Sequence, residues 1–148
     1  MKYLLRCLVL VSFMACTTEP RPINYGEDVC YYCKMNIVDR QHAAEAVTHK
    51  GRVYTFDAIE CMMNYVNRHG NTGAYKFLLV NNYLDPGAFI PALESHYLIS
   101  EEIPSPMGAF LSAFPDEASA RSMQKKKGGQ TFDWNELMAH AKAEGLIN

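Results

Sequence analysis

A strand-to-helix junction occurs twice in this chain and narrows the folds that the chain can adopt. Residues 55–60 and 131–136 share the pattern Thr-Phe-Asp-x-x-Glu. In each copy an aspartate follows a β-prone run and a glutamate stands three residues later, which is the capping-box pattern that starts a helix. The first junction leads into apolar residues at helical spacing, which are Ile59, Met62, Met63 and Val66. We therefore expect short strands with helices packed on them, and the repeat suggests an internal duplication.

The first helix is expected over residues 57–69, because basic residues fall in its last turn and Gly70 ends it. Two strands, over 43–48 and 51–56, are expected to pair directly before it. The other expected elements are a strand over 76–80, a strand over 96–100, a helix that starts at Pro115-Asp116-Glu117 and ends at Gly128-Gly129, and a helix after Asp133.

These elements predict an α+β fold of two small, similar ββα-type halves packed together, over residues 26–84 and 85–148. A chain of 148 residues has room for one compact unit or two very small ones. Its apolar fraction of 49% and charged fraction of 20% exclude a disordered chain. The net charge of -2 gives no basic surface for nucleic acid, so we expect no such partner.

Residues 1–15 are expected to be a secretory signal sequence, because Lys2 and Arg6 precede a short apolar run. That run is too short to span a bilayer, which takes about 20 apolar residues. Cys16 follows it, and the polar, Pro-rich stretch over 16–25 is typical of a tether. We expect lipidation of Cys16 and a mature protein anchored at a bacterial membrane, on its periplasmic or extracytoplasmic side. An ordinary signal sequence with a chance cysteine is the alternative.

The chemistry of the chain centres on the motif Cys30-x-x-Cys33-x-Met35. Two thiolates and a thioether are soft ligands, and soft ligands select Cu(I). Zinc is a weaker interpretation, because a structural zinc ion takes four ligands and no second Cys or His pair follows. A Cys30–Cys33 disulfide stays open, as does a redox-active Cys-x-x-Cys pair.

Two further sulfur residues are candidates for the same site. Cys61 lies off the apolar stripe of the first helix, so it either reaches the site or is covered by the sheet. Met107 follows a Pro-rich segment and precedes Gly108, which lets another backbone come close. Met107 therefore either packs in the core or supplies a ligand from the second half.

The mature chain resembles the NosL family, the copper-carrying lipoproteins associated with nitrous oxide reductase. Where this family usually has glycine before the methionine of the motif, the chain has Lys34. The resemblance covers most of residues 26–137. It rests on segments in order along the chain, which are Glu27-Asp28-Val29-Cys30-Tyr31-Tyr32-Cys33-Lys34-Met35-Asn36-Ile37, Ala43-Ala44-Glu45, Phe56-Asp57, Ser105-Pro106-Met107-Gly108, Ala113-Phe114, Gly128-Gly129 and Phe132-Asp133.

The resemblance implies Cu(I) held by Cys30, Cys33 and Met35, with Met107 as the next candidate ligand, and Cys61 stays a further candidate. It also implies a fold shared with part of organomercurial lyase. Two functions are open. The first is a lipid-anchored Cu(I) metallochaperone, not an enzyme, that delivers copper to an extracytoplasmic copper enzyme or its maturation complex, with nitrous oxide reductase as the expected recipient. The alternative is a periplasmic thiol–disulfide oxidoreductase that uses Cys30 and Cys33.

Overall fold

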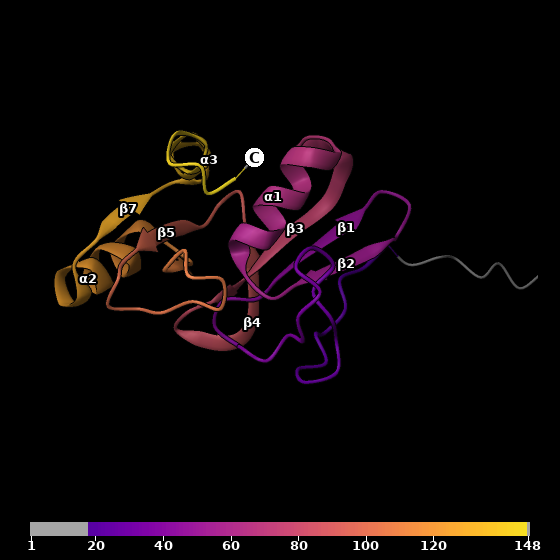
Figure 1. Cartoon of the computed structure of the whole chain (residues 1–148), viewed down its shortest axis with the longest axis horizontal. Helices are drawn as coiled ribbons and strands as arrows, with labels where there is room; N and C mark the ends of the chain where they lie inside the picture. The colour runs from indigo at the N-terminus through magenta and orange to yellow at the C-terminus, as the bar shows by residue number, and fades with distance from the viewer. Residues whose placement is uncertain (1–17, 148) are drawn as a thin grey trace, which may run out of the picture.

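The computed structural model describes residues 18–147, which form one mixed β-sheet with three α-helices (Figure 1). The predicted α+β class is confirmed. None of the helices in this described part is long and apolar enough to cross a membrane. In chain order the elements are β1 (Ala44–Thr48), β2 (Val53–Phe56), α1 (Ile59–His69), the 3-10 turn η1 (Thr72–Ala74), β3 (Tyr75–Asn82), β4 (Asp85–Pro91), β5 (His96–Ile99), β6 (Leu111–Phe114), α2 (Glu117–Lys127), β7 (Gln130–Phe132) and α3 (Trp134–Ala143).

The sheet contains two three-stranded groups, β2-β1-β3 and β6-β5-β7, that have the same connectivity. In each group the first strand in the sequence is central, and both of its neighbours are antiparallel to it. A helix connects the second strand to the third. The groups meet where β3 and β6 run parallel, at the pair Asn82 and Ala113. Each group thus contains a ββα succession, while the relation to organomercurial lyase stays a prediction.

The Thr-Phe-Asp repeat does not relate equivalent positions of these two groups. Phe56 ends β2, whereas Phe132 ends β7, and the strand that corresponds to β2 by connectivity is β6. The two copies match because a β-prone pair followed by a helix-capping aspartate is a common way to join a strand to a helix. The two copies of the repeat thus lie at non-equivalent positions of the two strand groups, so the repeat is not evidence for an internal duplication.

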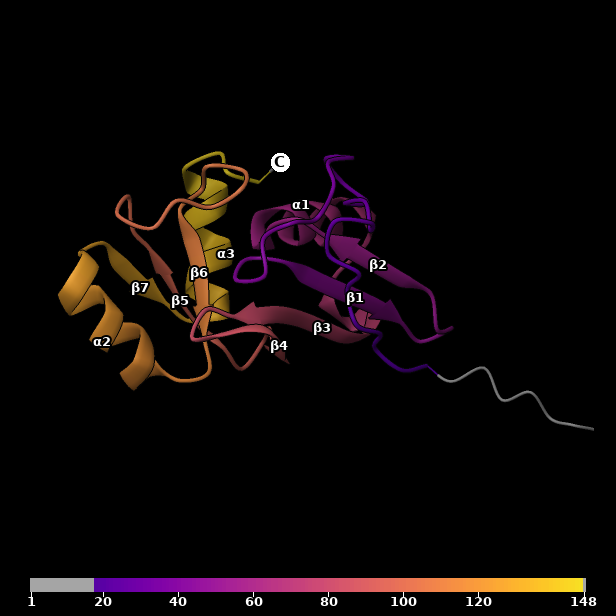
Figure 2. The same cartoon turned by 90° about the horizontal axis from the view of Figure 1, so that it is seen from below.

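The helices cover both faces of the sheet. Neighbouring side chains of a strand point to opposite faces, and on β5 Tyr97 packs in a large core with α1 and α3, whereas Leu98 packs against Ala120 of α2. Figure 2 shows α2 and α3 on opposite sides of β5 and β7. The large core lies between α1, α3 and the sheet, so residues at the start of α1 face the middle of the molecule.

Strand β4 has no counterpart among the predicted elements. Its Pro86, Gly87 and Pro91 disfavour a strand, but β4 pairs only with β3 and prolines are tolerated on such edge strands. The expected division after residue 84 falls between these two hydrogen-bonded strands.

The N-terminal part of the described chain packs against the sheet. The backbone N–H of Arg21 donates to the Glu45 carboxylate at 3.1 Å, and the side chain of Ile23 is buried. The expected tether is therefore part of the folded domain from Arg21 onward. The expected signal sequence and Cys16 lie outside the described residues.

The predicted cap of α1 by Asp57 is wrong, whereas the matching cap of α3 is confirmed. Asp133 and Glu136 form a reciprocal capping box. Helix α1 instead begins after Ala58, without a side-chain cap. Asp57 is almost fully buried, and its backbone N–H donates to the sulfur of Cys30. The residue is thus held at the cysteine cluster rather than at the helix end.

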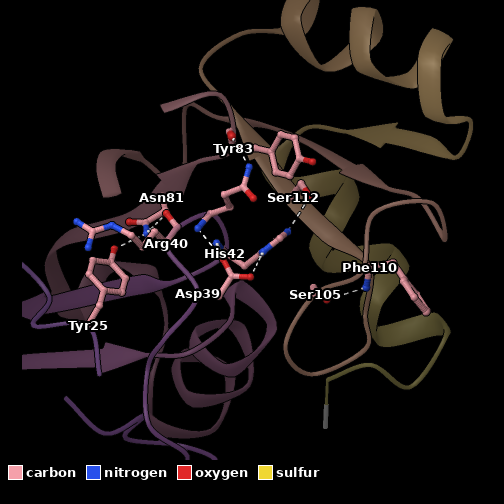
Figure 3. Close-up of polar contacts among 10 residues, drawn as sticks. Tyr25, Asp39, Arg40, His42, Asn81, Tyr83, Ser105, Phe110 and Ser112 are labelled. Carbon is pink, nitrogen blue, oxygen red and sulfur yellow. Dashed lines mark hydrogen bonds and ion pairs between the residues drawn. The ribbon is translucent and has the colours of Figure 1, made fainter. Parts of the chain in front are cut away.

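A buried polar network joins the two strand groups (Figure 3). The His42 ring contacts Asp39 through Nδ1 at 3.0 Å and the Ser112 hydroxyl through Nε2 at 3.1 Å. The side-chain amide of Asn81 donates to the backbone carbonyl of Arg40 at 2.7 Å. This order of Asp, His and Ser resembles a hydrolase triad, but Ser112 is fully buried and no substrate can reach it. The network therefore stabilises the place where the two strand groups meet, at the parallel pair of β3 and β6.

Candidate metal centre

Three cysteines from two distant segments meet in one cluster. The sulfur atoms of Cys30, Cys33 and Cys61 all lie within 4.8 Å of one another. Cys30 and Cys61 are 0% and 1% exposed, whereas Cys33 is half-buried. None of the three forms a disulfide. Of the two interpretations of Cys61, the structure favours the one in which it reaches the site.

A tight hairpin over residues 29–36 carries the first two cysteines. The Cys30 N–H donates to the Met35 carbonyl at 2.8 Å, and the Lys34 N–H donates to the Cys30 carbonyl at 3.0 Å. The Tyr31 N–H donates to the Thr55 carbonyl at 2.8 Å, which fastens the hairpin to β2. Because β2 leads directly into α1, the same contact sets the hairpin above the helix that carries Cys61.

Lys34 occupies a backbone conformation that usually requires glycine. Its φ of 66° lies in the left-handed region, where a side chain costs roughly 1–2 kcal/mol. This conformation gives a physical reason for the glycine that is usual at this position of the motif. The lysine side chain folds back, and its Nζ donates to the Tyr31 carbonyl at 2.6 Å.

Cys30 is arranged as a thiolate. A hydrogen bond from the Cys61 thiol lowers the pKa of Cys30 from 9.0 to about 5, against the opposing effect of burial. The backbone N–H groups of Asp57 and Cys33 also donate to the Cys30 sulfur, the latter at 3.4 Å. A soft cation would therefore meet one ready thiolate at neutral pH.

The other two cysteines are held as thiols. The hydrogen bond to Cys30 is the main cause that raises the pKa of Cys61, and burial raises the pKa of Cys33. Ligand thiols must lose their protons when they bind a metal. Binding of one ion by all three sulfurs would thus release up to two protons, because Cys30 has already lost its own.

Two buried carboxyl groups lie next to the cluster. Burial and the charge of Cys30 raise the pKa of Asp57 to about 6, and its Oδ1 has no hydrogen-bond partner among the described residues. Burial also raises the pKa of Glu60, and neither of its carboxylate oxygens has a hydrogen-bond partner among the described residues, although the backbone N–H of Ala109 is near enough to oppose this rise. A cation in the cluster would stabilise both carboxylates. Because the backbone N–H of Ala109 lies near Glu60, the turn that contains Met107, two residues before Ala109, lies beside the start of α1.

The two predicted methionine ligands lie at the surface. Met35 is 45% exposed and Met107 is 42% exposed, so neither packs in the core. Met107 stands on a turn in which the Gly108 N–H donates to the Ser105 carbonyl at 3.0 Å. In the same turn the Phe110 N–H donates to the Ser105 hydroxyl at 2.9 Å (Figure 3). Their roles as copper ligands stay predictions.

Sequence reasoning missed the electrostatic part of this site. Asp57 was expected at a helix cap and Glu60 in a capping box, so neither was expected beside a thiolate. The sequence carried no signal for Glu60, because consecutive helical residues do not share a face. Glu60 is buried because every residue from Ile59 to Val66 is covered in α1.

Comparison with known proteins gives two matches. The family model described as NosL matches residues 22–141. The crystal structure of the copper chaperone NosL from Shewanella denitrificans is similar with a TM-score of 0.69 and 19% sequence identity, and the alignment covers 81% of this chain and 96% of that chain. No curated protein sequence matches the chain.

Proposed function

Because the chain belongs to the NosL family, we propose that it is a copper-binding chaperone that carries Cu(I) as its cargo. The resemblance noted in the sequence is confirmed by the family model. The similar crystal structure is itself described as a copper chaperone, which supports the same function here.

The observation that carries the proposal is the cluster of Cys30, Cys33 and Cys61 within 4.8 Å. Sulfur ligands select Cu(I) over harder cations. Cys33 is the only one of the three with substantial exposure, so it lies where copper enters and leaves. The exposed thioethers of Met35 and Met107 are suited to complete the ligand set or to hand copper on.

A zinc site has less support. Structural zinc takes four nitrogen, sulfur or oxygen ligands in a closed tetrahedron. Within the described residues, the group that could hold a metal contains the three cysteines and no histidine.

The thiol–disulfide oxidoreductase has less support as well. A redox-active Cys-x-x-Cys pair needs an accessible thiolate that can attack a substrate disulfide. Here the thiolate is Cys30, which is 0% exposed, while the accessible Cys33 has a raised pKa. The nucleophile and the exposure are thus on different residues.

We further propose that the recipient is an extracytoplasmic copper enzyme, nitrous oxide reductase or its maturation complex, and that Cys16 anchors the chaperone in the membrane. The family membership supports the recipient. The signal-like segment before Cys16 supports the anchor. A lipid anchor would hold the copper site close to a membrane-associated assembly complex.

Copper competition on the reduced protein tests the function. The protein should bind one Cu(I) tightly in competition with a coloured chelator and show little affinity for Zn(II). Cys30→Ser, Cys33→Ser and Cys61→Ser should each lower the Cu(I) affinity more than about tenfold, or about 1.4 kcal/mol. Equal competition by zinc would contradict the proposal.

The methionines are tested by Met35→Leu and Met107→Leu with Met138→Leu as the matched control. The swap conserves volume and should cost less than about 1.5 kcal/mol of stability. We expect X-ray absorption to lose one sulfur scatterer in the two site variants and none in the control, which lies on α3. An unchanged spectrum for Met107→Leu would confine copper to the residues of the first half.

A further inference from the structure

The hairpin over residues 29–36, which carries Cys30 and Cys33, is surrounded by cations that form cation–π contacts with tyrosine rings. The Lys34 Nζ lies 4.5 Å from the centre of the Tyr31 ring. The Arg52 guanidinium lies 4.9 Å from the Tyr54 ring and donates to the Tyr31 hydroxyl at 3.1 Å. These contacts hold two positive charges at defined places beside the motif.

Arg68 adds a third cation from the last turn of α1. Its guanidinium lies 5.4 Å from the Tyr32 ring. The rings themselves are packed edge to face, with the centres of Tyr31 and Tyr54 4.6 Å apart and those of Tyr31 and Tyr65 5.3 Å apart. Three segments of the chain thus present one connected surface of rings and cations.

None of these three cations forms an ion pair with a carboxylate in the described part of the chain. Elsewhere Arg21 pairs with Asp28 at 2.7 Å, and Arg121 pairs with Glu117 at 2.6 Å. Lys34, Arg52 and Arg68 are exposed. The chain as a whole carries a net charge of -2, so this positive surface runs against its overall charge.

The same surface contains the copper exit. Cys33 lies between Tyr32 and Lys34 in the chain, and the exposed Met35 follows. Any acceptor that takes copper from Cys33 must bring its own ligand to this place. The charges around the exit therefore act on whatever approaches it, over about 10 Å at 0.1 M salt.

We propose that this docking face, formed by Tyr31, Tyr32, Lys34, Met35, Arg52 and Arg68, binds an acidic protein surface that surrounds the copper-accepting site of the recipient. The proposal rests on the copper-carrying function. Unpaired, preorganised cations favour association with a negative partner and speed its approach. A protein is the occupant rather than an anionic membrane, because lipid laid on this face would close the exit of the copper.

Two synthetic acceptor peptides test the proposal with copper as the probe. Both carry one Cys-x-x-Cys core, flanked by glutamates in one peptide and by lysines in the other. At low ionic strength, the Cu(I)-loaded protein should transfer copper to the glutamate-flanked peptide at least about tenfold faster than to the lysine-flanked peptide. The difference should vanish near 1 M salt, where the Debye length is about 3 Å.

Charge reversal supplies the matched variants. Arg52→Glu with Arg68→Glu should keep the Cu(I) affinity and lose or reverse the preference for the acidic peptide. Lys125→Glu with Lys126→Glu, at the end of α2, should keep the preference, because this site lies on another element. Should the first double variant fail to fold, the salt dependence of the native protein still decides the question.

Three results would overturn the proposal. Equal transfer rates to both peptides at low salt would remove the electrostatic role while leaving the copper function intact. Failure of the native protein to load Cu(I) would remove the proposed function and this inference together. Binding to vesicles of phosphatidylglycerol and phosphatidylcholine that is lost in Arg52→Glu with Arg68→Glu, together with equal peptide rates, would make the face a membrane contact.

Discussion

Removal of the Cys61 thiol should raise the pKa of Cys30. The hydrogen bond from Cys61 is the largest cause that lowers the Cys30 pKa to about 5. In Cys61→Ala the burial of Cys30 remains, and burial alone favours the neutral thiol. The variant therefore leaves the N–H groups of Asp57 and Cys33 and the Cys33 thiol to stabilise the thiolate.

The size of the effect follows from the energy of one hydrogen bond. A hydrogen bond to a charged group contributes about 1.5–3 kcal/mol. At 1.36 kcal/mol per pH unit this corresponds to a rise of about one to two units. The titration midpoint of Cys30 should thus move from about 5 to about 6 or 7.

Thiolate absorbance of the reduced, metal-free protein between about pH 4 and pH 9 measures this midpoint. Cys61→Ser is the matched control, because its hydroxyl can still donate to Cys30 while the thiol is gone. We expect the serine variant to titrate closer to the native protein than the alanine variant does. The affinity for Cu(I) should fall in both, since both lack the third sulfur.

Two outcomes would refute this reasoning. If the alanine and serine variants share one midpoint, the Cys61 hydrogen bond does not hold the thiolate. If the native protein has no thiolate below about pH 7, the hydrogen bonds to Cys30 do not overcome its burial, and all three thiols must lose their protons when copper binds.

Glu45 and Cys16 provide the remaining predictions. Burial raises the pKa of Glu45 to about 7 from 4.5, so the folded state holds a proton that the unfolded state releases, and stability falls as pH rises from about 4.5 to about 7. Glu45→Gln should remove this loss in the free energy of unfolding, which is on the order of 2 kcal/mol at pH 8 and close to nothing at pH 4. Denaturant unfolding of both proteins across this pH range measures the difference. Equal pH profiles for the two proteins would contradict the prediction. Cys16→Ala should move the protein to the soluble fraction and abolish labelling with a radioactive fatty acid, and retained labelling would exclude lipidation of this cysteine.

The sequence determined the local elements and the first two candidate ligands. Strands β1 and β2 and the helices α1, α2 and α3 follow from apolar spacing and end signals, which act over a few residues. The motif Cys30-x-x-Cys33-x-Met35 predicted soft-metal chemistry, because its three sulfur residues lie close together in the chain whatever the rest of the chain does.

The tertiary structure decided what depends on the approach of distant segments. Cys61 joins the cluster because the hairpin lies on β2, directly before α1, where the Tyr31 N–H donates to the Thr55 carbonyl. Asp57 does not cap α1, because its backbone N–H donates to the Cys30 sulfur and the helix begins after Ala58. Arg68 reaches Tyr32 across the same junction. Helical spacing shows which face a residue occupies, but which other segment covers that face is set by packing of the whole core.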